Sequence, residues 1–224
     1  MATELQRRTA EIIKRLKKAY PLARVELNFS NPFELLIASI LAAQNTDANV
    51  NSVTRTLFRK YRGPSDFFAA DSAQLERDIY STGFFRQKAR AIRAVSKAIL
   101  EDFNGKLPNS MEEMLRLPGV GRKTANVVLG EAMGVVAGIV VDTHNIRLAE
   151  RLGLSRQKTA EKIERDLMAI VPKQDWIKFG QLITWHGRRI CKARTPECEK
   201  CILEDICPSA YTAKKGKTAR RVLK

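Results

Sequence analysis

The stretch LPGVGRKTANVVLG, residues 117–130, constrains the fold more than any other segment, because it joins two helical patterns through only a few residues. Upstream, Ser110 and Glu113 have the spacing of a capping box, which predicts the start of a short helix that stops at Pro118. The apolar positions of that helix are Met111, Met114, Leu115 and Leu117. The next helix begins at once, with a buried stripe of Ala125, Val128, Leu129 and Ala132. The stretch therefore predicts a helix, a tight hairpin turn and a second helix.

The turn in this stretch has the composition of a phosphate-binding site. Gly119 and Gly121 leave the backbone N–H groups unblocked, and these donors together with the helix dipole suit a phosphate oxygen. Arg122 adds positive charge there. Lys123 follows in the first turn of the helix, where the positive field favours the uncharged amine that a nucleophile requires. An ordinary helical connection would explain the glycines equally well, but Lys123 adds a candidate Schiff-base lysine.

Length and net charge limit the kind of molecule that this chain can be. At 224 residues it can bury one good core or two modest ones, and we expect two small lobes. Its 40 Lys and Arg against 24 Asp and Glu leave a net charge of +16, which predicts a polyanionic partner. Charge alone does not separate DNA from RNA or an acidic membrane, nor does it exclude a basic protein without a nucleic-acid role.

Four cysteines lie close together near the end of the chain, with the spacing C-x6-C-x2-C-x5-C, at Cys191, Cys198, Cys201 and Cys207. No apolar run approaches the roughly 18 residues of a membrane-spanning helix, and the N-terminal segment does not resemble a signal peptide. We therefore expect a cytoplasmic protein, in which clustered cysteines are metal ligands rather than disulfides. Zinc is the default metal for four cysteines, but zinc sites commonly use two short Cys-x-x-Cys pairs and this sequence has one. The wider, uneven loops suit a larger centre.

Helix-boundary signals in the first part of the chain predict an exposed turn around Gln44. A helix over residues 33–43 is apolar almost all round and ends at Gln44. Asp47 is expected to cap the next helix, which Gly63 and Pro64 close. Taken alone, Gln44 marks only the end of a buried helix.

Aromatic residues mark a second turn. Gly83 ends a helix that Asp71 caps, and Phe84 and Phe85 follow before a helix over residues 86–103. Two adjacent aromatic residues after a terminating glycine most often anchor a turn, so we expect at least one of them to do so here.

Asp142 follows a short apolar run, residues 135–141, that is expected to be extended. Either Asp142 or Thr143 is predicted to cap a helix over residues 145–152. An aspartate at a helix start is usually only a cap, and His144, without metal-ligand spacing, is usually a structural hydrogen-bonding residue.

Three of these segments, together with the cysteine spacing, resemble one known family. The hairpin stretch, the segment AQNTD at residues 43–47 and the segment VDTH at residues 141–144 are similar to those of the endonuclease III group of DNA glycosylases. The cysteine spacing matches, at all four positions, the loop that holds a [4Fe–4S] cluster in that group. The resemblance covers most of residues 25–208.

The resemblance implies roles for individual residues. Lys123 would be the nucleophile and Asp142 the essential aspartate facing it across a cleft, with His144 in a supporting position. Gln44 would fill the gap left by an extruded nucleotide, and Phe84 would be the apolar wedge that unstacks the DNA from the minor groove.

The same resemblance implies contacts with the DNA backbone. The hairpin residues expected to grip phosphates are Gly119, Gly121 and Arg122. The cluster, read as structural, would display Lys192, Arg194 and Lys200 towards the backbone, although Glu197 and Glu199 in the same loop reduce its positive charge. The tail, residues 211–224, is strongly basic, and we expect it to be disordered.

The fold implied by the resemblance is all-α with two lobes. Residues 25–135 would form a six-helix lobe that contains the helix–hairpin–helix at about residues 110–133. Residues 1–24 and 136–210 would form the cluster lobe, with the [4Fe–4S] loop over residues 191–207.

The function implied is that of a bifunctional DNA glycosylase and abasic-site lyase in base excision repair. It would act on double-stranded DNA that contains oxidised pyrimidines or abasic sites, as a nucleoid-associated monomer. One alternative is a monofunctional mismatch glycosylase of the same superfamily, which would lack a lysine at position 123. A second is a non-catalytic helix–hairpin–helix DNA-binding module, which would need neither Lys123 nor Asp142. A third, an iron–sulfur redox protein, would leave the charge of +16 unexplained.

Overall fold

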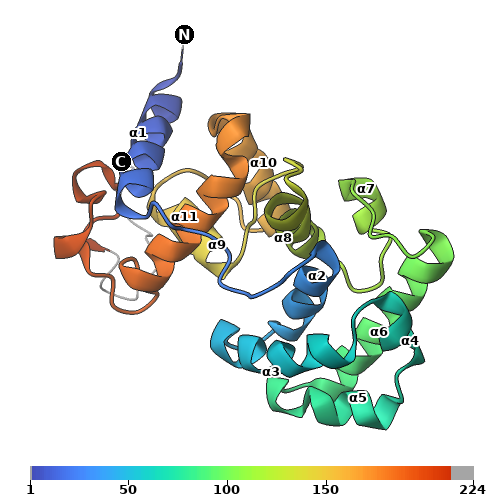
Figure 1. Cartoon of the computed structure of the whole chain (residues 1–224). Helices are drawn as coiled ribbons and strands as arrows, with labels where there is room; N and C mark the ends of the chain where they lie inside the picture. Colours follow the sequence, from blue (N-terminus) through green and yellow to red (C-terminus); the bar gives the residue numbers. More distant parts are fainter. Residues whose placement is uncertain (1, 213–224) are drawn as a thin grey trace. The chain divides into compact units, whose positions relative to one another are not determined.

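The computed structural model describes residues 2–212, which form helices and no β-strand (Figure 1). The α-helices in chain order are α1 (Glu4–Ala19), α2 (Pro32–Leu41), α3 (Asp47–Lys60), α4 (Pro64–Ala69), α5 (Ser72–Asp78), α6 (Phe85–Asp102), α7 (Met111–Met114), α8 (Arg122–Met133), α9 (Thr143–Arg151), α10 (Ala160–Ile170) and α11 (Trp176–Arg189). Short 3₁₀ turns are η1 (Tyr80–Thr82), η2 (Lys173–Asp175), η3 (Cys198–Lys200) and η4 (Glu204–Ile206). The prediction of an all-α fold is confirmed.

The chain divides into two compact units, each with its own core. One unit is the continuous segment Val25–Ala137, which contains α2 to α8. The other combines the segment up to Arg24 with the segment from Gly138 onwards, and it contains α1, α9, α10 and α11.

The core of the unit Val25–Ala137 forms around α2. Asn31 caps this helix by accepting a hydrogen bond of 2.9 Å from the Glu34 N–H, and Pro32 occupies its first turn, where a missing N–H costs nothing. Its apolar residues face all directions, and α3, α6 and α8 pack against it. The fully buried members are Leu35, Leu36, Ile37, Ala38 and Leu41.

Helix α4 in this unit was not predicted. Gly63 and Pro64, which were expected only to close α3, are instead the N-cap and the first residue of a six-residue helix that packs on α6. Phe67 secures this helix, because its fully buried ring lies 5.8 Å from that of Phe33 and 4.9 Å from that of Tyr61, centroid to centroid.

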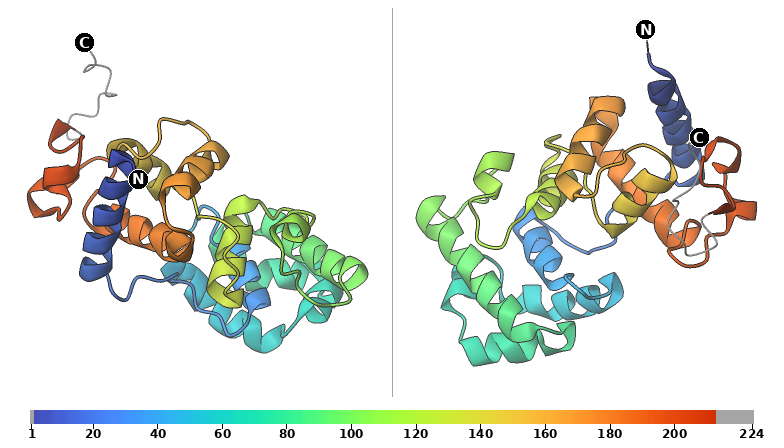
Figure 2. Two further views of the ribbon diagram at one scale, coloured as in Figure 1. Left: turned by 90° about the horizontal axis from the view of Figure 1, so that it is seen from above. Right: turned by 180° about the vertical axis from the view of Figure 1, so that it is seen from behind.

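In the second unit, α1 packs against α11 and lies alongside the segment that contains three of the cysteines, as both views in Figure 2 show. Arg15 on α1 donates 3.0 Å hydrogen bonds to the Ile202 carbonyl and to Asp205 Oδ2. The buried face of α1 supplies Ile12, Ile13 and Leu16 to the core of this unit.

Several other boundary predictions are confirmed, but the one at the start of α3 is wrong. Asp71 caps α5, and Ser110 accepts the Glu113 N–H at the start of α7. Thr46, not Asp47, is the N-cap of α3, because its hydroxyl accepts the Asn49 N–H. Leu115, which was predicted as an apolar position of the short helix, is 41% exposed and lies just after the end of α7 at Met114.

From residue 213 on, the predicted basic tail lies outside the described residues. Within residues 2–212, no helix has both the length and the apolar character needed to cross a membrane.

Candidate functional site

The hairpin before α8 ends at a glycine, which provides no side-chain cap for the helix. Leu117 and Val120 are buried and fix the turn to the core, while Gly119 adopts a left-handed conformation with φ of 74°. Gly121 is the N-cap of α8, and because it has no side chain the first-turn N–H groups receive no capping hydrogen bond from it. A Cβ atom at Gly121 would meet no atom within 4 Å, so packing does not require a glycine at this position.

Lys123 lies in the first turn of α8 with an exposed side chain. Arg122, the first residue of the helix, is half-buried. The predicted hairpin residues therefore form one surface of the unit Val25–Ala137, in which the N-terminus of α8 and two cationic residues lie next to one another.

Asp142 lies in the other unit, at the N-terminus of α9. Its Oδ1 accepts hydrogen bonds from the N–H groups of His144 (2.8 Å) and Asn145 (2.9 Å) and from Asn145 Nδ2 (3.1 Å). Its Oδ2 accepts from His144 Nδ1 at 3.1 Å, and its side chain remains 16% exposed. Asp142, rather than Thr143, is therefore the cap, and His144 contacts it directly.

These hydrogen bonds keep the Asp142 carboxyl group ionised. Burial raises the pKa of Asp142, but the hydrogen bonds from His144 and Asn145 outweigh that effect and leave the pKa well below its usual value. At neutral pH the site therefore holds a fixed negative charge, partly open to solvent.

Asn145 is a site residue that the sequence analysis missed. It is fully buried, and its Nδ2 donates to Thr184 Oγ1 (2.9 Å) on α11 as well as to Asp142. Helix α11 can come this close because two of its glycines, Gly180 and Gly187, lie against the segment around the start of α9. A Cβ atom at Gly187 would lie 3.1 Å from His144 Cβ. An asparagine three residues after a capping aspartate was the only local signal.

Gln44 and Phe84 occupy exposed turns of the unit Val25–Ala137. Both adopt left-handed backbone conformations that are uncommon for residues other than glycine, with φ of 53° at Gln44 and 47° at Phe84. Phe84 is 61% exposed, whereas Phe85 packs against Tyr80 with ring centroids 4.8 Å apart. The expectation that one of the two phenylalanines anchors the turn thus applies to Phe85.

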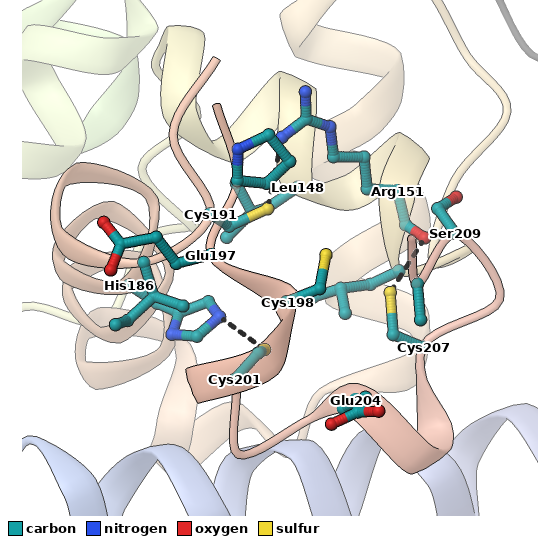
Figure 3. A pocket seen from close by; sticks show the side chains of 14 residues that line it. Leu148, Arg151, His186, Cys191, Glu197, Cys198, Cys201, Glu204, Cys207 and Ser209 are labelled. Carbon is teal, nitrogen blue, oxygen red and sulfur yellow. Dashed lines mark hydrogen bonds between the residues drawn. The ribbon is translucent and has the colours of Figure 1, made fainter. Parts of the chain in front are cut away.

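All four cysteines line a single cavity in the second unit (Figure 3). The sulfur atoms of Cys191, Cys198, Cys201 and Cys207 come from separate parts of residues 191–207 and surround this space. Within residues 2–212, no three His, Cys, Asp or Glu side chains converge closely enough to hold a single metal ion. The wide and uneven spacing of the four cysteines along the chain is the feature that suits a centre with several metal atoms.

The chemistry of these thiols also fits a metal centre. Burial, reinforced by the neighbouring sulfurs, raises the pKa of Cys201 to about 11. Burial raises the pKa of Cys207 as well. Thiols must lose their protons to bind a metal, and positive charge between gathered thiolates, as iron or zinc provides, stabilises them.

Residues from three helices hold the cysteine segment in place. Arg151 on α9 donates to Cys191 Sγ (3.3 Å) and to the Lys192 and Ala193 carbonyls (both 2.8 Å). His186 on α11 contacts Cys201 Sγ through Nε2 (3.4 Å) and Tyr20 through Nδ1 (3.0 Å). Burial lowers the pKa of His186 to about 4, so its ring is neutral at physiological pH, with one ring nitrogen as a donor and the other as an acceptor.

The basic residues around the cysteines have different surroundings. Lys192 and Lys200 both pair with Glu197, at 2.5 Å and 3.1 Å, which offsets the charge that they would present to DNA. Arg194 is exposed.

The hairpin, the helical fold and the distribution of charge define a class of DNA repair protein: residues 37–173 match the HhH-GPD superfamily of base excision DNA repair proteins. The protein named Endonuclease III of Synechocystis sp. is 49% identical over 213 residues, which cover 95% of this chain and 97% of that protein. The chain belongs to the endonuclease III family.

Two solved structures share this fold closely. A non-covalent Endonuclease III–DNA complex and a trapped Endonuclease III–DNA covalent intermediate are each 42% identical to this chain, with a TM-score of 0.88. Each match covers 95% of this chain, and 98% and 99% of the two solved chains. The function predicted from the sequence is confirmed at this level: the protein is a DNA-binding enzyme of base excision repair, with glycosylase and abasic-site lyase activity.

The hydrogen bonds of Asp142 predict a contribution to stability that depends on pH. A carboxyl group whose pKa is lowered on folding stabilises the protein above its unfolded-state pKa of about 3.9, and this contribution is lost as the pH falls towards the folded-state pKa. Asp142→Asn should therefore lower the free energy of unfolding by about 1–3 kcal/mol at neutral pH. Urea denaturation at about pH 7 and about pH 3 should show a smaller difference from the wild type at the lower pH. An equal difference at both values would contradict the assignment.

Proposed function

We propose that the enzyme removes oxidised pyrimidines from double-stranded DNA and cleaves the resulting abasic strand through a Schiff base on Lys123. The proposal rests on the position of this exposed amine, two residues after Gly121, the N-cap residue of α8. A phosphate bound at the N-terminus of α8 would bring the neighbouring deoxyribose near the lysine.

DNA binding would begin with charge. The net charge of +16 releases counterions from duplex DNA on binding, so affinity falls as salt rises. The hairpin amides and Arg122 then hold phosphates beside the lesion, the damaged nucleotide leaves the helix, and Gln44 and Phe84 enter the space left behind. The exposure of both side chains supports these roles.

In the chemical step, the unprotonated Nζ of Lys123 attacks C1′ of the damaged nucleotide. The C1′–N bond breaks, and its electron pair leaves with the base, which takes up a proton. The attached nitrogen then loses one proton and forms a double bond to C1′ while the C1′–O4′ bond of the sugar ring breaks; O4′ takes up a proton, and the product is a protonated Schiff base between Nζ and C1′. A proton then leaves C2′, and the C3′–O bond breaks with its electron pair moving to the 3′ phosphate. Water finally hydrolyses the Schiff base and regenerates the amine.

Asp142 would act through its charge. A carboxylate that stays ionised when partly buried stabilises the positive charge that develops on the sugar, and it can accept a proton from the reacting amine. His144 and Asn145 would orient it, since each donates a hydrogen bond to one of its oxygen atoms.

Cys191, Cys198, Cys201 and Cys207 would hold a [4Fe–4S] cluster, as expected for this family. When bound, the cluster ties the cysteine segment into one rigid loop, and no step of the reaction passes through it. Arg151, Arg15 and His186 position the same loop from three helices, and Arg194 would face the DNA backbone.

With chromosomal DNA as substrate, we place the protein in the cytoplasm at the nucleoid. We expect it to act as a monomer, because the proposed reaction uses side chains of one chain only.

The proposal predicts that wild-type enzyme forms an adduct, trapped by borohydride, with a duplex that contains one thymine glycol. Lys123→Gln should lower strand cleavage by at least about a thousandfold while duplex affinity changes only a few-fold, because the nucleophile is lost and the hairpin donors remain. The matched control Lys158→Gln removes a lysine that is 82% exposed and should behave as wild type. Free base with an intact abasic strand would indicate a monofunctional glycosylase. Cleavage retained by Lys123→Gln would place the nucleophile elsewhere.

The cysteine cavity predicts roughly four iron atoms per chain in protein purified without oxygen. Cys198→Ala removes one sulfur and should lose most of the iron together with its visible absorbance. Ser209→Ala, which changes another residue lining the cavity, should keep both. About one zinc per chain and no iron would identify a single-ion site instead.

A further inference from the structure

Lys88 is a buried cation that the proposed reaction does not use. It lies on α6 with 5% of its surface exposed, and no carboxylate in residues 2–212 pairs with it. Burial lowers the pKa of Lys88, because a buried ammonium group loses its hydration. A lysine is rarely kept in such a position unless its ammonium group makes specific contacts.

The two contacts of Lys88 join segments that lie about 40 residues apart in the chain. Its Nζ donates to the Leu41 carbonyl and to the Thr82 carbonyl, both at 2.8 Å. Leu41 is the last residue of α2, just before the turn that carries Gln44, and Thr82 is the last residue of η1, just before Phe84. The ammonium group therefore links the backbone segments that immediately precede the two exposed turns.

The local electrostatics explain why a lysine is tolerated there. Carbonyl groups at the end of a helix lack intrahelical partners and carry the negative end of the helix dipole, so the end of α2 stabilises a cation. An apolar side chain at position 88 would leave both buried carbonyls without this donor.

A second contact joins the same two turns on the solvent side. Asn49 Nδ2 donates to the Ser81 carbonyl at 2.9 Å and to Asn45 Oδ1 at 3.2 Å. Asn45 and Ser81 flank Gln44 and the Phe84 turn respectively, so two independent donors hold these turns at a fixed separation.

We propose that Lys88 is a positioning residue for nucleotide extrusion: it fixes the spacing between Gln44 and Phe84 so that both side chains enter the DNA together. This inference rests on the proposed roles of those two residues. If either turn shifted, one side chain alone would not fill the space in the duplex, and the extruded nucleotide would return to it more readily.

The test uses a duplex with 2-aminopurine beside a single thymine glycol, since the fluorescence of this base rises when its neighbour is extruded. At saturating enzyme, Lys88→Met should reduce the fluorescence rise and lower the rate of base release about tenfold, the effect of roughly 1.4 kcal/mol. Duplex affinity should change less than the rate. The control Lys97→Met, on the same helix with a side chain that is 54% exposed, should match wild type.

A double-mutant cycle separates positioning from general destabilisation. In a Gln44→Ala/Phe84→Ala background, Lys88→Met should cause little further loss of extrusion, because nothing remains for it to position. The same tenfold loss in both backgrounds would overturn the inference. Asn49→Ala breaks only the solvent-side contact and should reduce extrusion in the same direction, and it tests the inference should Lys88→Met fail to fold. A wild-type fluorescence response in Asn49→Ala and Lys88→Met would also overturn it.

Failure of this inference is distinguishable from failure of the proposed function. Wild-type enzyme that forms the borohydride-trapped adduct, together with a Lys88→Met variant that extrudes normally, would reject only the role of Lys88. Wild-type enzyme that forms no adduct would reject the proposed reaction itself.

Discussion

The ionised carboxylate of Asp142 at the start of α9 is the interaction on which the proposed chemistry depends. Four hydrogen bonds from His144 and Asn145 keep its charge where burial alone would favour the neutral acid. The N-terminus of α8 is built in the opposite way, because its N-cap residue, Gly121, has no side chain to accept a hydrogen bond from the helix. One helix start is thus filled by a carboxylate of the protein, while the other is available to a phosphate of the DNA.

The two turns proposed to contact DNA, at Gln44 and Phe84, have strained backbone conformations and are held by hydrogen bonds within the unit. Gln44 and Phe84 adopt left-handed conformations that cost energy for residues with a side chain, and such strain persists only where the surrounding structure imposes it. Lys88 and Asn49 supply that constraint through hydrogen bonds to the backbone near each turn. Rigid turns suit side chains that must enter a duplex, because less conformational entropy is lost on binding.

Features set by local sequence could be predicted, whereas features set by tertiary packing could not. The caps at Asp71 and Ser110 and the four clustered cysteines follow from residue type and spacing. Helix α4 was missed because six residues carry too little periodicity, and it is held mainly by the packing of Phe67. The burial of Lys88 could not be predicted, because its hydrogen-bond acceptors are backbone carbonyl groups. Every residue has such a group, so the sequence does not show which of them lie near Lys88.

The central claim is that the amine of Lys123 forms the covalent bond to DNA. Its most direct test is to reduce the enzyme–DNA intermediate with borohydride, digest the adduct with protease and nuclease, and identify the modified residue by mass spectrometry. The account predicts the sugar remnant on Nζ of Lys123. A remnant on any other lysine or on the N-terminal amine would contradict it.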